Sequence, residues 1–137
     1  MAIKPREYYQ VSVGRNFPST GEQAPAWLVD LAYDLNRCCE RTPATKNKFE
    51  TGDPKALLSQ VQAPTLILWG MNNPTVMHLE GDVIDHWLSS APSLLIKYPG
   101  LGHYPYIEAS NVVNTDILRF LEGAMDADLR VTQRVKP

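Results

Sequence analysis

The chain has 137 residues, of which 44% are apolar and 20% are charged, and its formal net charge is −2. A chain of this length predicts one domain with a sizeable buried core. The slightly acidic balance lacks the positive field of nucleic-acid-binding proteins, and no stretch of eighteen apolar residues predicts a membrane span. We therefore expect neither nucleic acid nor a membrane among its partners.

Two features of the first third of the chain bear on its cellular location. The opening residues, Met1 to Glu7, lack the apolar stretch of a secretory signal. The only cysteines, Cys38 and Cys39, are adjacent, and neighbouring cysteines rarely pair because their side chains diverge. Reduced thiols are typical of a cytoplasmic protein, which is the location we expect.

Residues 1–24 are expected to form an N-terminal arm. The loose alternation over residues 8–13 predicts a short edge strand, and the proline, serine and glycine content of residues 14–24 predicts a loop.

Residues 25–39 predict a helix, and Pro25 suits its first position. Its apolar residues recur every three or four positions and so share one face. They are Trp27, Leu28, Leu31, Leu35 and Cys38.

A polar, partly basic stretch over residues 40–52 is typical of a solvated linker. Asp53 then has the character of a helix N-cap, with Pro54 in the first turn. We expect a short helix there, with Leu57 and Leu58 facing inward.

Residues 63–123 contain an unbroken apolar run at 64–70 and a second, mainly apolar run at 93–98, each followed by a glycine or proline turn. Such runs are typical of strands buried on both faces of a parallel sheet. Helices are expected over residues 79–90 and 110–123, and the order strand, helix, strand predicts a right-handed crossover. The residues expected to face inward are Leu79, Val83, Trp87 and Leu88 in the first helix and Val113, Ile117, Phe120 and Leu121 in the second, which Ser110 would cap. The predicted fold class is α/β.

The tail, residues 124–137, has little apolar periodicity and is expected to fray. Two strands alone would leave the strand at 64–70 with an unpaired edge. Its neighbour would have to come from residues 8–13, from a second copy of the chain or from another polypeptide. We therefore expect a homo-oligomer, most simply a homodimer.

Polar residues follow both strands, since Asn72 and Asn73 come after the first and His103 after the second. The carboxyl ends of parallel strands share one edge, where open α/β sheets bind ligands. We therefore expect Asn73 and His103 to lie side by side. Trp69 and Tyr104 are candidates for the wall of a pocket there, although packing alone is the commoner role of such residues.

No metal or cofactor is expected. His78 and His86 are eight residues apart, about 12 Å along a helix, which is too far to share one ion with His103. The chain also carries no glycine-rich phosphate loop and no dinucleotide fingerprint.

The sequence PTLILWG at 64–70 precedes the Asn-Asn-Pro-Thr turn, and Gly102-His103 precedes Glu108 and Arg119-Phe120-Leu121. In these pieces the segment 53–122 resembles the C-terminal part of the α/β-hydrolase superfamily. It is most similar to members with Asn-Asp-Pro in the turn, including hydrolases of meta-cleavage products. The resemblance implies an incomplete hydrolase core, made of the last two parallel strands with flanking helices, after a lid-like helical segment at 25–62.

The same resemblance places His103 at the position of the catalytic histidine and Asn73 at the position of the catalytic acid. It also implies that Trp27 and Leu31, with Leu35, line a substrate cavity, although burial of that helix face in a core is the better explanation. The chain departs from the family in having Asn rather than Asp at position 73, and no serine lies in a G-x-S-x-G motif.

The chain thus resembles a fragment, subunit or relic of a hydrolase, and two functions remain open. It could supply His103 and a pocket wall for hydrolysis of an ester or a carbon–carbon bond, inactive alone but acting on a small molecule once a complementary half that carries the nucleophile completes it. Alternatively, it could be a non-catalytic interaction module that binds a partner through the exposed sheet edge and the lid-like helix.

Overall fold

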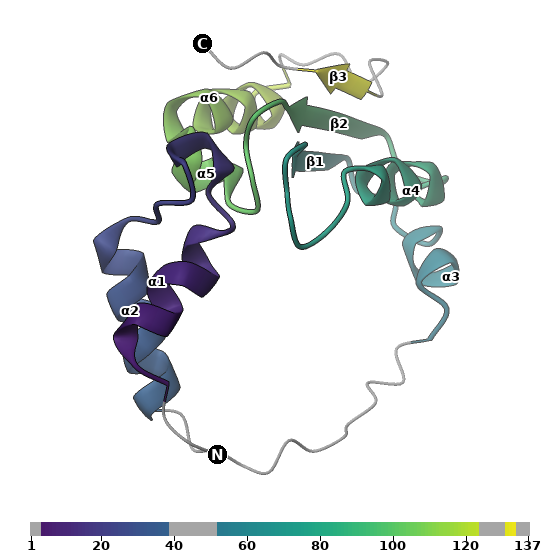
Figure 1. Cartoon of the computed structure of the whole chain (residues 1–137). Helices are drawn as coiled ribbons and strands as arrows, with labels where there is room; N and C mark the ends of the chain where they lie inside the picture. The colour runs from purple at the N-terminus through teal and green to yellow at the C-terminus, as the bar shows by residue number, and fades with distance from the viewer. Residues whose placement is uncertain (1–3, 39–51, 124–130, 134–137) are drawn as a thin grey trace.

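The structure is a computed structural model that describes residues 4–38, 52–123 and 131–133. Helices and short parallel strands alternate along the second half of the chain (Figure 1). The elements in chain order are α1 (Arg6–Gly14), the 3-10 helix η1 (Pro18–Thr20), α2 (Ala26–Cys38), α3 (Pro54–Leu58), β1 (Thr65–Gly70), α4 (Leu79–Trp87), β2 (Ser93–Tyr98), α5 (Pro105–Glu108), α6 (Ser110–Leu121) and β3 (Val131–Gln133). The protein is therefore a small α/β fold.

The sheet has three parallel strands in the order β1-β2-β3. Strand β1 pairs with β2 from Thr65 opposite Ser93 to Gly70 opposite Tyr98, as the two apolar runs predicted. Every residue of β2 is buried, because a strand flanks it on each side and other residues pack on both of its faces. Strand β1 has a described neighbour on one side only and is partly exposed.

The third strand corrects the expectation that the tail frays throughout. Residues 131–133 pair in parallel with residues 95–97 of β2, and the rest of the tail lies outside the described residues. Backbone pairing on the open edge of a buried strand needs no apolar periodicity, so the sequence pattern gave no signal of it.

Helices cover the two faces of the sheet (Figure 1). On one face, alternate residues of β2 pack with Leu101 and Val113 under α6; they are Leu94, Ile96 and Tyr98. On the other face, Leu95 packs with Ile67 of β1 and Leu88 beside α4. This period of two is what a central strand covered on both faces requires.

Some details of the helices differ from expectation. Three residues expected to face inward are exposed instead: Leu57, Leu79 and Leu121. Ala109, not Ser110, occupies the N-cap of α6 and makes no capping hydrogen bond through its side chain. The predicted cap of α3 is confirmed, since the Asp53 carboxylate accepts a hydrogen bond from the backbone N–H of Lys55 at 3.1 Å.

The edge strand predicted for residues 8–13 is wrong, because these residues lie within helix α1. The helix buries Tyr9, whose ring lies 5.9 Å from that of Tyr33 in α2. Arg6 donates a 2.6 Å hydrogen bond to Asp30, which raises the pKa of the guanidinium. Packing against a second helix has overridden a weak local alternation.

Helix α2 exposes the apolar face that was expected to be buried. Trp27, Leu31 and Leu35 are 57%, 46% and 54% exposed, while Val29 on another face is buried. The pair α1–α2 lies beside the sheet layers rather than over them, and residues 14–21 join it to the core (Figure 1). No helix in the described ranges combines the length and apolar character needed to cross a membrane.

Candidate functional site

The turn after β1 and the loop after β2 meet at one rim of the sheet, because parallel strands end at the same edge. Their backbones are in close contact: a Cβ on Gly70 would lie 1.9 Å from the carbonyl oxygen of Gly102. Asn72 joins them further, since its N–H donates to the Leu101 carbonyl and its Oδ1 accepts from the Gly100 N–H, both at 2.9 Å. The two segments therefore form one rigid unit.

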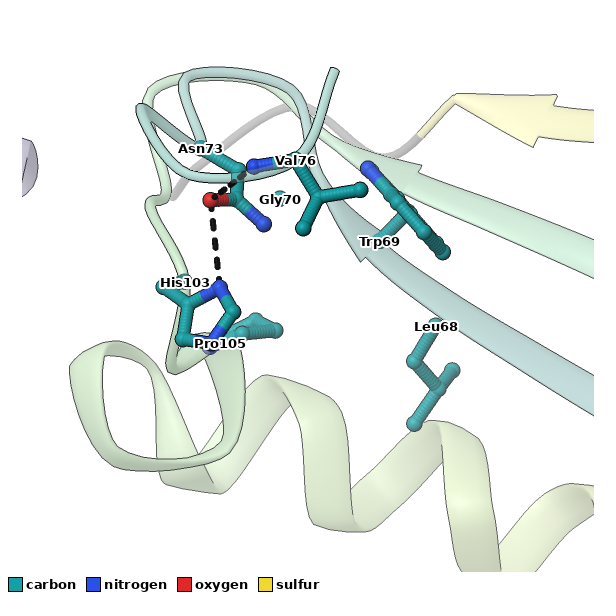
Figure 2. Close-up of a pocket in the computed structure, with 7 residues that line it drawn as sticks. All are labelled: Leu68, Trp69, Gly70, Asn73, Val76, His103 and Pro105. Carbon is teal, nitrogen blue, oxygen red and sulfur yellow. Dashed lines mark hydrogen bonds between the residues drawn. The ribbon is translucent and has the colours of Figure 1, made fainter. Parts of the chain in front are cut away.

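This rim brings Asn73 and His103 together, with 3.1 Å between Asn73 Oδ1 and His103 Nδ1 (Figure 2). The same Asn73 oxygen accepts hydrogen bonds from the backbone N–H groups of Thr75 at 2.9 Å and Val76 at 3.2 Å. Asn73 is thus held by its own turn and not only by the imidazole. Of its two ring nitrogens, His103 uses Nδ1 for this contact and leaves Nε2 without a described protein partner.

A pocket of about 170 Å³ opens beside this pair (Figure 2). Its walls are mostly apolar and come from β1, the two loops and the start of α5. They are Leu68, Trp69, Gly70, Asn73, Val76, His103 and Pro105. The indole nitrogen of Trp69 is buried without a hydrogen-bond acceptor among the described residues.

The other predicted wall residues lie elsewhere. Tyr104 packs against His103 edge to face, with ring centroids 4.9 Å apart, and its ring is not part of the pocket wall. Trp27 and Leu31 do not line the pocket either, and both lie exposed on α2. Of the four residues predicted to contact a substrate, only Trp69 lines this pocket.

Residues before α2 hold this rim in place, which the sequence did not reveal. The Asn16 carbonyl accepts a 3.0 Å hydrogen bond from the His103 backbone N–H, and its side-chain oxygen accepts from the Thr75 hydroxyl at 2.8 Å. Phe17 is 1% exposed and packs on Tyr104. Asn16 therefore links the histidine loop to the asparagine turn.

Glu108 links the same parts of the chain through its carboxylate. One oxygen accepts from the Gly102 N–H at 2.7 Å, and the other accepts from the Ser19 hydroxyl at 2.5 Å and the Ser19 N–H at 3.4 Å. Both oxygens are thus committed to loop backbone and Ser19. Glu108 is therefore a positioning residue for the His103 loop.

We expect Glu108→Ala to lower the free energy of unfolding by about 2–3 kcal/mol, because three donors lose a charged acceptor. Amide hydrogen exchange at Gly102 and Ser19 should speed up, while exchange in β2 follows global stability. Glu122→Ala, at the exposed end of α6, is the matched control and should change stability by less than about 0.5 kcal/mol. Equal effects of the two variants would contradict the proposed linking role.

Two acids and the other two histidines of the chain lie on or beside α4. On α4, Asp82 pairs with Lys97 and Asp85 accepts from the Ser93 hydroxyl, both at 2.6 Å. His78 occupies the N-cap position of α4 without a capping hydrogen bond from its side chain, and His86 lies in the last turn of α4. Within the described ranges, no three His, Cys, Asp or Glu residues are grouped as a metal site would require.

Comparisons of this chain with protein families, with curated proteins and with solved structures find no match. The fold and the site therefore define only a class: a small α/β protein that presents a His–Asn pair and an apolar pocket at the carboxyl rim of a parallel sheet.

Proposed function

We propose that this chain is the C-terminal part of an α/β-hydrolase, supplying the catalytic histidine and one pocket wall for hydrolysis of an ester or a carbon–carbon bond. The observation that supports it most is the 3.1 Å contact between His103 and Asn73 beside an apolar pocket. In this proposal the chain is inactive alone, and its substrate is a small molecule.

The role of His103 follows from its two nitrogens. With Nδ1 directed at Asn73, Nε2 can take the proton of an attacking hydroxyl and later return it to the leaving group. Asn73 orients the ring but carries no charge to stabilise the imidazolium formed in between. In serine proteases, a change from Asp to Asn in this role lowers turnover about 10⁴-fold because the histidine takes the wrong tautomer. Where the tautomer is kept, the missing charge alone would still slow the completed enzyme, unless a second segment supplies the acid.

The nucleophile would also come from another segment. No serine of the chain lies in a nucleophile elbow, and the hydroxyls of Ser19 and Ser93 donate to Glu108 and Asp85. Strand β1 pairs only with β2 among the described residues, so its outer edge could accept a strand from a complementary half or a second copy.

The test combines the purified chain with a nucleophile-bearing N-terminal half of an α/β-hydrolase. We expect no hydrolysis of a small aryl ester by either part, turnover by the mixture, and loss of that turnover in His103→Ala. His86→Ala, at an exposed position of α4, is the matched control and should leave turnover unchanged. A mixture that associates in native mass spectrometry without turnover would contradict the catalytic proposal.

A non-catalytic interaction module is the second candidate, and the exposed apolar face of α2 favours it. Trp27, Leu31 and Leu35 together form a surface typical of a protein contact. In this case Trp27→Asp should abolish association, whether with a second copy or with another chain, and His103→Ala should not. Light scattering of the two variants and the unchanged chain separates this function from the first.

A further inference from the structure

The side chain of Asn73 can take only one orientation. An amide offers one acceptor oxygen and one donor nitrogen, and backbone N–H groups can only donate. Two of them, from Thr75 at 2.9 Å and Val76 at 3.2 Å, converge on the same side-chain atom of Asn73. That atom must be the oxygen, because the amide NH2 group is itself a donor and cannot accept hydrogen bonds from backbone N–H groups. The turn therefore fixes this orientation without any contribution from His103.

The fixed oxygen also faces the imidazole, 3.1 Å from His103 Nδ1 (Figure 2). An oxygen that already accepts two hydrogen bonds can receive a third only from a donor, so Nδ1 must carry a proton. In a neutral imidazole the other ring nitrogen, Nε2, then carries no proton. We infer that Asn73 is a positioning residue that fixes His103 in its Nδ1–H tautomer and leaves Nε2 as a neutral base.

Asn73 fixes the tautomer of His103 without adding a charge, whereas an aspartate at this position would do both. An aspartate would fix the same tautomer and add a negative charge to stabilise the imidazolium. An asparagine free to rotate could offer its NH2 group to Nδ1 and impose the opposite tautomer, which removes the base. Here the turn at 73–76 keeps the orientation while the charge is lost. The consequence for catalysis rests on the proposed function, whereas the tautomer follows from the hydrogen bonds alone.

The experiment is long-range proton–nitrogen NMR of the imidazole rings in the full chain, at a pH where histidines are neutral. Nitrogen shifts distinguish protonated from unprotonated ring nitrogens, and the variant His103→Gln assigns the signals. We expect a protonated Nδ1 and an unprotonated Nε2 in His103. His78 and His86 are internal references and should show the tautomer mixture of a free imidazole, in which Nε2–H dominates.

Variants at position 73 complete the test. Asn73→Ala should return His103 to the mixture of the two reference histidines, and Asn73→Asp should retain the Nδ1–H form. A dominant Nε2–H form of His103 in the unchanged chain would overturn the inference, as would an unchanged tautomer in Asn73→Ala. If Asn73→Ala does not fold, the tautomer of His103 in the unchanged chain and in Asn73→Asp still tests the inference. The NMR measurement does not depend on turnover. If NMR confirms the Nδ1–H tautomer but the mixture with an N-terminal half hydrolyses no ester, only the hydrolase proposal is rejected.

Discussion

Gly70→Ala should lower the free energy of unfolding by about 3–5 kcal/mol, a large fraction of the stability of a small domain. The added Cβ would lie 1.9 Å from the carbonyl oxygen of Gly102 and 2.7 Å from that of Leu101. Both are backbone atoms of the loop that carries His103, so no side-chain rotation can relieve the contact. Only separation of the two loops would make room, and that would break the hydrogen bonds of Asn72 to Leu101 and Gly100.

Urea denaturation followed by circular dichroism measures this effect. The matched control is Gly52→Ala, where an added Cβ meets nothing within 4 Å, and we expect a change of less than about 0.5 kcal/mol. Gly52 and Gly70 undergo the same chemical change, so the difference between them reports crowding alone. Equal midpoints for the two variants would show that the turn after β1 and the His103 loop are not in contact.

The parts of this rim that were predictable from the sequence are those that depend on local pattern. Apolar runs bounded by proline and glycine identified β1 and β2, and the shared direction of parallel strands placed Asn73 near His103. Asp53 followed by Pro54 identified the start of α3. The signals for β1, β2 and α3 are local, and only the meeting of Asn73 with His103, 30 positions apart, also needed the direction of the strands.

The parts that were missed depend on contacts far apart in the sequence. Glu108 and Ser19 are 89 positions apart, and nothing in either neighbourhood indicates that they meet. A backbone carbonyl such as that of Asn16 carries no sequence signal at all. Periodicity revealed an apolar face on the helix containing Trp27 but could not tell whether anything covers it.

Asp82→Ala should lower the free energy of unfolding by about 2 kcal/mol. Lys97 lies in the central strand and is 6% exposed, and its ammonium donates to the Asp82 carboxylate at 2.6 Å. Breaking a fully buried pair costs about 3–5 kcal/mol because one charge is left unpaired. The Asp82 side chain is 38% exposed, so water can partly replace it and the expected cost is smaller.

Lys97→Met distinguishes the unpaired charge from the lost pair. It removes the ammonium and keeps an apolar side chain of similar length, so stability should be nearly unchanged or slightly higher. In the double variant Asp82→Ala/Lys97→Met, the loss caused by Asp82→Ala alone should largely disappear, as urea midpoints of the four proteins would show. Additive losses would mean that Asp82 does not serve to neutralise Lys97.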